Sequence, residues 1–108
     1  MQMFEDYLKS LKKTNRKILH NEYGFITYAI FSNECRIEDC FIVDKHRNDG
    51  KFKEMYNEIE NYCKKYNIKY LTTHSTLDNK KSIEVSCSLG FKIKEYKNNY
   101  VYLIKELL

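Results

Sequence analysis

Residues 40–52 read Cys-Phe-Ile-Val-Asp-Lys-His-Arg-Asn-Asp-Gly-Lys-Phe, and this stretch decides the fold. Its apolar first part predicts a buried strand, Gly50 predicts a turn, and the apolar spacing that starts at Phe52 predicts a helix. A strand that runs through a glycine turn into a helix leaves several backbone N–H groups without partners in the helix. With the helix dipole behind them, these groups form a site for an anion such as a phosphate. Arg47 and Lys51 add positive charge beside that site.

The pattern on either side of the turn predicts a mixed α/β domain. Apolar residues at helical spacing predict helices over residues 2–13, 51–66 and 79–90. Alternating, aromatic and β-branched runs predict strands over residues 16–19, 24–31, 35–43, 68–74, 92–96 and 100–107. A strand, a helix and a strand in succession imply a parallel pair within an otherwise antiparallel sheet. We expect this sheet to carry helices on both faces and to form one domain over residues 1–108.

Composition excludes several classes of function. The formal net charge of the 108 residues is +4, and the lysines are spread along the chain among acidic residues, which indicates a solvated surface and argues against a nucleic-acid partner. No run approaches the ~20 apolar residues that span a bilayer. The first residues lack the apolar core of a signal peptide, so we expect a cytoplasmic protein without a membrane partner.

The four cysteines do not have the spacing of a zinc site or of a Cys-x-x-Cys motif, so no metal is expected. Cys40 lies in an apolar strand and Cys63 on the apolar face of a helix, and both are interpreted as small core residues. Reduced thiols agree with a cytoplasmic location.

Two motifs carry a resemblance to a known family. Residues 47–52, Arg-Asn-Asp-Gly-Lys-Phe, are similar to the Arg/Gln-x-x-Gly-x-Gly/Ala signature that follows the central strand of GNAT-type N-acetyltransferases. Residues 79–91 resemble the family's second marker, an Asn-led helix that ends in Leu-Gly-Phe. The similarity runs over residues 24–107. Compact chains of this kind also occur in phages and mobile elements, and the AT-rich composition is compatible with such an origin.

The resemblance implies a transferase that moves an acetyl group from acetyl-CoA to an amine, on a small molecule or on a protein. It also implies that the central parallel strands splay apart to admit the pantetheine arm of coenzyme A, while the pyrophosphate lies on the glycine turn. The positions that correspond to coenzyme A contacts in the family are Phe41, Ile42, Val43, Arg47, Asn48, Asp49, Gly50, Lys51, Phe52, Asn79 and Ser82.

Acyl transfer to an amine needs a base, donors for the developing oxyanion and an acid for the leaving thiolate. By resemblance, Glu38 is the candidate base; the alternative is a polar residue on a half-exposed strand. Strand alternation predicts that Asp39 points to the opposite face. Ser86 occupies the position where many members carry a tyrosine as general acid. Because serine is a poor acid, protonation would fall to water or to another tyrosine, for which the candidates are Tyr96, Tyr100 and Tyr102.

The chain departs from the family pattern in further ways. Phe52 replaces a small residue and is expected to point into the core instead of toward the pyrophosphate. The region before Gly24 is too short for the family's usual strand and two helices, so the acceptor cleft is open, completed by a partner or second copy, or absent. A homodimer and a non-catalytic module that binds a protein partner therefore stay as alternatives. His74, at a strand end, is either an acceptor-site residue or a structural histidine.

Overall fold

The computed structural model describes residues 16–43, 45 and 49–107. The helix predicted over residues 2–13 lies outside the described residues, and so do Arg47 and Asn48 of the predicted phosphate turn. None of the described helices is both long enough and apolar enough to cross a membrane.

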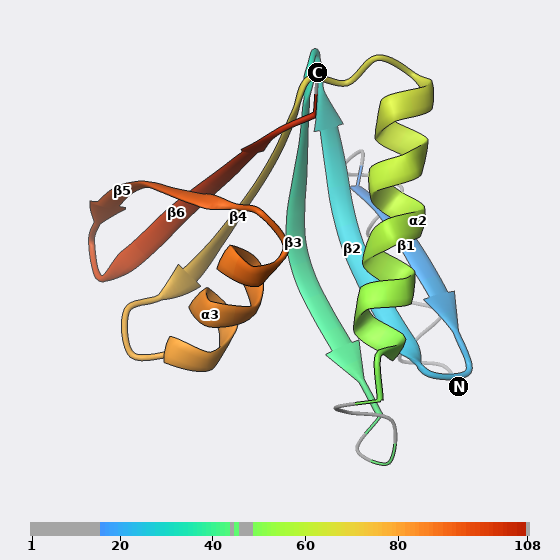
Figure 1. The fold of residues 1–108 in the computed structure, drawn as a ribbon, viewed down its shortest axis with the longest axis horizontal. Coiled ribbons are helices and arrows are strands. Elements are labelled where there is room, and N and C mark those ends of the chain that lie inside the picture. The colour runs from blue at the N-terminus through green and yellow to red at the C-terminus, as the bar shows by residue number, and fades with distance from the viewer. Residues whose placement is uncertain (1–15, 44, 46–48, 108) are drawn as a thin grey trace.

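Within the described residues, six strands form one sheet in the order β1-β2-β3-β4-β6-β5 (Figure 1). Each strand lies where the sequence predicts one, with ends that differ by a residue or two. Only β3 and β4 pair in parallel among the described strands, which confirms the mixed, mostly antiparallel sheet. The strands are β1 (Arg16–Asn21), β2 (Gly24–Phe31), β3 (Glu34–Ile42), β4 (Tyr70–Thr76), β5 (Lys92–Lys97) and β6 (Tyr100–Glu106).

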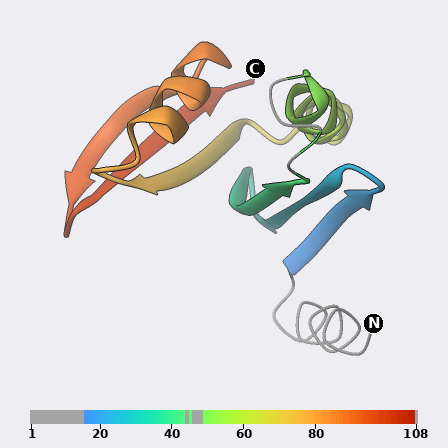
Figure 2. The same cartoon turned by 90° about the horizontal axis from the view of Figure 1, so that it is seen from below.

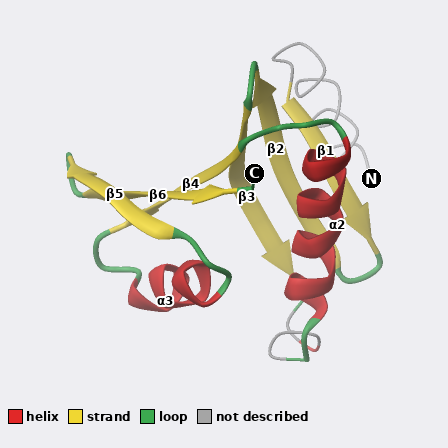
Figure 3. Ribbon diagram, turned by 45° about the horizontal axis from the view of Figure 1, so that its top comes forward, coloured by secondary structure: helices red, strands yellow, loops and turns green. Residues whose placement is uncertain are grey.

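Two described helices, α2 (Lys51–Lys65) and α3 (Lys80–Ser88), lie on the same face of the sheet (Figure 2). Helix α2 runs along β2 and β3, and α3 lies beside the half of the sheet formed by β4, β5 and β6 (Figure 3). The mixed α/β fold is confirmed, whereas the two described helices cover one face of the sheet and not both faces as predicted. The further helix that the sequence places in front of β1 falls among the residues that are not described.

The core forms between this helical face and the sheet. Residues of α2 at helical spacing are buried there, and they pack on inward-facing residues of the central strands. The core residues whose side chains are almost completely buried are Ile26, Cys35, Met55, Tyr56, Cys63, Leu71, Val101 and Leu103. The predicted stripe of α2 also includes Tyr62 and Tyr66, but both are exposed. These two lie at the edge of the helix face, where their rings pack on each other with centroids 4.7 Å apart.

The end of β3 differs from its prediction as a strand covered on both faces. Phe41 is 44% exposed, and Cys40 is exposed where the sequence predicts a core residue. The reason lies in the sheet, because β4 no longer pairs with β3 beyond Arg36 and cannot cover this part of the strand. Cys63 is buried as predicted, and all four cysteines are free thiols.

A charged cluster ties the two helices to the last strand. Lys105 of β6 donates hydrogen bonds to the Glu60 carboxylate of α2 and to the backbone oxygen of Leu89, the latter at 2.7 Å. Tyr56 donates to the same carboxylate oxygen at 2.7 Å, and Lys64 lies 3.3 Å from the other oxygen. Burial alone would raise the pKa of Glu60, but the hydrogen bonds from Lys105, Tyr56 and Lys64 outweigh burial and lower it.

We expect Glu60→Gln to lower the free energy of unfolding at pH 7 by about 2 kcal/mol, because the amide replaces a charged acceptor of three donors. The folded-state pKa of Glu60 lies below its unfolded value. The contribution of the ionised Glu60 carboxylate to the free energy of unfolding is therefore complete above about pH 4.3. It is lost as the pH falls through the folded-state pKa. Urea unfolding at pH 7 and pH 3 measures both effects, and the two proteins should converge at the lower pH.

The matched control is Glu58→Gln, which removes an exposed carboxylate from the same helix. Equal stabilities of the Glu58 and Glu60 variants at pH 7 would show that the cluster contributes nothing to folding.

Candidate functional site

The parallel strands β3 and β4 pair over only a short length. Their ladder joins Glu34 to Tyr70, Cys35 to Leu71 and Arg36 to Thr72, although β3 continues to Ile42 and β4 to Thr76. Beyond the ladder the strands diverge, as Figure 1 shows. At the point of divergence the Thr73 hydroxyl donates to the Ile37 carbonyl at 3.3 Å. The central strands are thus splayed, as the sequence resemblance implies.

A β-bulge lies in the diverging part of β3. Tyr28 of β2 pairs with Ile37 and Thr27 pairs with Asp39, so Glu38 is an extra residue without a place in the β2–β3 register. The buried Thr27 hydroxyl accepts a hydrogen bond from the Asp39 N–H at 3.0 Å, which replaces a ladder bond. Alternation does not hold across a bulge, so the prediction of opposite faces for Glu38 and Asp39 has no basis here.

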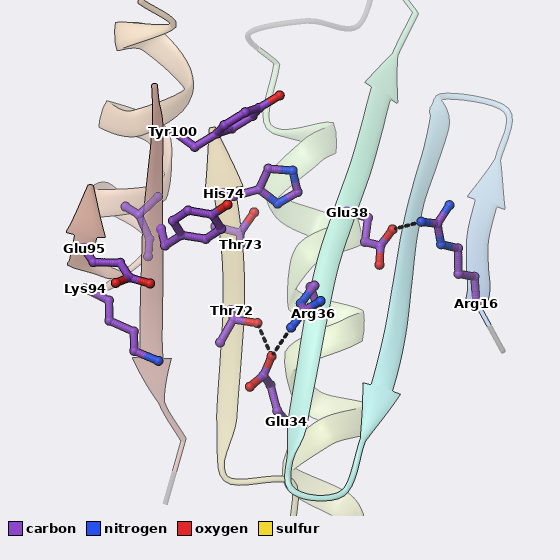
Figure 4. Close-up of a pocket in the computed structure, with 12 residues that line it drawn as sticks. Arg16, Glu34, Arg36, Glu38, Thr72, Thr73, His74, Lys94, Glu95 and Tyr100 are labelled. Carbon is purple, nitrogen blue, oxygen red and sulfur yellow. Dashed lines mark hydrogen bonds and ion pairs between the residues drawn. The ribbon is translucent and has the colours of Figure 1, made fainter. Parts of the chain in front are cut away.

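A cavity of about 500 Å³ lies where the strands diverge, and Glu38 lines it. Side chains from five strands contribute, and most of them are charged or aromatic (Figure 4). Most of them belong to the sheet face opposite the helices, because their neighbours in sequence, such as Cys35 and Leu71, are buried in the helical core. The described residues that line it include Arg16, Arg36, Glu38, His74, Tyr100 and Tyr102.

Glu38 forms an ion pair with Arg16 of β1. Nη2 of Arg16 lies 2.8 Å from Oε2 of Glu38, and the Glu38 side chain is only 15% exposed (Figure 4). The Glu38 carboxylate thus lies at the wall of the cavity with its charge balanced by a guanidinium. The sequence gives no signal for Arg16, since the contact joins strands that are not neighbours in the sheet.

A second carboxylate, Glu34, belongs to the same face at the narrow end of the divergence. Its Oε2 accepts a hydrogen bond from the Thr72 hydroxyl at 2.8 Å and a longer one from Arg36 at 3.4 Å. The alternation of Glu34, Arg36 and Glu38 with the buried Cys35 and Ile37 is the signal that could have placed these residues on one polar face.

The turn before α2 is described from Asp49 onward. Gly50 has a left-handed backbone with φ of 85°, and a Cβ added to it would meet no atom within 4 Å. Asp49 accepts a long hydrogen bond of 3.4 Å from the Lys51 N–H. Phe52 packs against the core with its ring 6.5 Å from that of Tyr56, as predicted. Its side chain is therefore directed toward the core.

The start of β2 supports this turn. Val43, which follows β3, donates its N–H to the Tyr23 carbonyl at 2.8 Å, and the Lys51 ammonium lies 4.5 Å from the centre of the Tyr23 ring. Gly24 brings the strands close together, since a Cβ there would lie 1.9 Å from the Phe41 carbonyl oxygen. Tyr23 thus contacts both the residue that follows β3 and the first residue of α2.

Helix α3 holds the remaining predicted site residues. The Asn79 side chain accepts a hydrogen bond from the Ser82 N–H at 3.2 Å and caps the helix, so both have a structural role. Ser86 is half-buried in α3 and is not among the described residues that line the cavity. Tyr100 and Tyr102 do line it, whereas Tyr96 is exposed elsewhere on β5. The coenzyme A contacts named from the sequence stay predictions.

These features define a domain of the GNAT fold class. The family model described as "Acetyltransferase (GNAT) domain" matches residues 23–106, and the chain belongs to this family. Members of the family bind an acyl-CoA and an amine acceptor, so acyl transfer to an amine is the class of reaction that this fold supports. A search of curated proteins found no match.

Solved structures share the fold at low sequence identity. The PaiA N-acetyltransferase from Thermoplasma acidophilum, in complex with coenzyme A, aligns with a TM-score of 0.80 at 16% identity, covering 96% of this chain and 69% of that chain. A GNAT-family acetyltransferase from Staphylococcus aureus gives 0.76 at 14% identity, with 96% and 75% covered. Ard1 from Thermoplasma volcanium gives 0.72 at 21% identity over 80% of this chain, which spans 64% of the Ard1 chain. These likenesses show the fold alone.

The bulge yields a test of how the site is built. Thr27→Val keeps the shape of the side chain but removes the acceptor of the Asp39 N–H, so we expect a loss of about 1–2 kcal/mol in the free energy of unfolding. Hydrogen exchange at the Asp39 amide should become about tenfold faster in this variant. Thr27→Ser retains the hydroxyl and should retain the protection. Equal protection in the valine and serine variants would contradict this account of the bulge.

Proposed function

We propose that this chain is an acetyl-CoA-dependent N-acetyltransferase whose acceptor is an amine of a small molecule or a protein. One observation carries the proposal: Glu38 lies at the wall of a cavity where β3 and β4 diverge. The family match adds that acyl transfer is the chemistry of this fold. A cytoplasmic site of action, where thiols stay reduced, agrees with four free cysteines.

The described residues fit coenzyme A at the start of α2. Space is open around the Cα atom of Gly50, and Phe52 is turned away into the core. The first N–H groups of a helix lack partners within it, and a helix of this length directs its dipole at an anion placed there. The residues that would hold the pyrophosphate are those of the turn up to Phe52, and the arm would follow Phe41, Ile42 and Val43. When bound, acetyl-CoA would supply a thioester-activated acetyl group.

Glu38 is the proposed base of the reaction. An amine is mostly protonated near neutral pH and becomes a nucleophile only after it has lost a proton. Glu38 would take that proton at its carboxylate, directly or through one water molecule. Arg16, at 2.8 Å from Oε2, acts as a positioning residue that restricts the carboxylate to the wall of the cavity. The thiolate that leaves needs a proton to become a thiol, and Tyr100 or Tyr102 could supply it from the cavity wall.

Glu38→Gln should lower kcat by about 10²-fold or more, because general bases contribute on that scale, while the affinity for coenzyme A stays unchanged. Release of free thiol from acetyl-CoA, followed across several amines and pH values, measures the rate, and calorimetry measures the affinity. The matched control is Glu58→Gln on the exposed face of α2, which should behave as the unmodified protein.

Equal rates for the Glu38 variant and the unmodified protein would remove Glu38 from the mechanism. Coenzyme A binding without turnover of any amine by the unmodified protein would favour the second candidate, a binding module that has lost the activity. This second candidate is supported by Ser86, which stands where many family members carry a tyrosine as general acid.

Gly50→Glu should abolish coenzyme A binding, because the new side chain fills the open space at the start of α2 with negative charge. The control is Gly50→Asn, since asparagine tolerates a left-handed backbone and adds no charge. Calorimetric titration with coenzyme A compares the two variants with the unmodified protein. Retained affinity in the glutamate variant would overturn the assignment of the phosphate turn.

A further inference from the structure

Three aromatic side chains share the wall of the cavity that faces Glu38. The His74 ring lies 5.7 Å from that of Tyr100 and 6.1 Å from that of Tyr102, and the two tyrosine rings lie 6.4 Å apart. Figure 4 shows His74 and Tyr100 on the β4 and β6 side of the divergence, across the gap from Glu38 on β3. We call this group the aromatic wall.

Strand register places the aromatic wall on the open face of the sheet. His74 pairs directly with Tyr102, and Tyr100 follows two residues away on the same strand. The alternate residues Val101 and Leu103 are buried in the helical core, so the three rings point away from that core. Tyr100 is 38% exposed and His74 is exposed, which means that neither ring is needed to complete the packing against the helices.

The wall and the proposed base lie on opposite sides of one gap. The last parallel pair of the ladder is Arg36 with Thr72, so Glu38 and His74 would be neighbours if the register continued. Because the strands diverge there, the space between the carboxylate and the rings becomes part of the cavity. The volume of about 500 Å³ falls in the range of sites for small molecules.

We infer that the acceptor is a small aromatic amine, a primary amine carried on a short chain from a planar ring. The inference rests on the function proposed above and names its substrate class. The ring of the acceptor stacks on the aromatic wall, where offset or edge-to-face contacts are favourable. The amino group then reaches across the divergence to Glu38, which accepts its proton. An aliphatic amine satisfies the carboxylate but leaves the wall without a planar partner.

The test compares two amines with the same carbon skeleton, 2-phenylethylamine with a planar aromatic ring and 2-cyclohexylethylamine with a saturated ring. Calorimetry in the presence of saturating coenzyme A measures their binding, and thiol release from acetyl-CoA measures their kcat/KM. We expect the planar amine to bind about tenfold more tightly and to have a kcat/KM about tenfold higher. The preference should appear mainly in KM.

Variants at the wall separate the ring from the hydroxyl group. Tyr102→Phe keeps the ring and should keep the preference for the planar amine, whereas Tyr102→Leu should lose it. Tyr100→Leu removes another ring of the aromatic wall at a more exposed position, and it replaces Tyr102→Leu if that variant does not fold. Urea unfolding shows whether each variant is folded.

The outcomes distinguish this inference from the proposed function. Turnover of the two amines with the same kcat/KM as each other, both in the unmodified protein and in each leucine variant, would overturn the aromatic acceptor. It would leave the N-acetyltransferase intact. Preferential binding of the planar amine that is lost in the leucine variants, without any thiol release, would support the aromatic site and overturn the enzyme. Absence of both binding and turnover for the two amines would overturn the inference directly.

Discussion

The short ladder between β3 and β4 is the constraint on which the rest of the structure depends. Three residues on each strand hold the two halves of the sheet together, and the strands separate immediately afterwards. A sheet that remained paired would bring the edge of β4 against Glu38 and leave no cavity. The bulge in β3 works with the divergence, because an extra residue turns the strand and increases its local twist. The buried hydroxyl of Thr27 stabilises the bulge by accepting the Asp39 N–H that the ladder cannot satisfy.

The two faces of the sheet divide the structural and chemical roles between them. The helical face carries the apolar core and the Glu60–Lys105 cluster, which joins α2, the end of α3 and β6. Charged residues on that face satisfy one another and hold the elements in place. On the opposite face, one carboxylate oxygen of Glu38 forms an ion pair with Arg16. The rings of His74 and Tyr100, which line the same cavity, are exposed. Substitutions on the first face should therefore act through stability and those on the second through binding or rate.

Local patterns predicted most of the fold, while contacts distant in sequence escaped prediction. Helix α2, the turn at Gly50 and the six strands each follow from spacing within a few residues, and the structure confirms them. The bulge has no local signature, because it depends on how Thr27 meets Asp39 across two strands. The exposure of Cys40 and Phe41 could not be predicted either, because it also depends on contacts between strands. An apolar run indicates burial only where a neighbouring strand covers it, and here that neighbour has already diverged.

The candidate site shows the same division. The resemblance singles out Glu38 by its place on the central strand, three residues before Phe41, and the structure adds that it lines the cavity. Arg16 could not be found in this way, since its role comes from a contact between β1 and β3 across an intervening strand. The tyrosines gave too many candidates in a chain that contains ten of them. Register reduces that number, because the tyrosines of β6 that line the cavity, Tyr100 and Tyr102, alternate with the buried Val101 and Leu103. The same alternation brings Tyr102 next to His74, so the features that exclude other tyrosines are also those that build a surface for an aromatic ring.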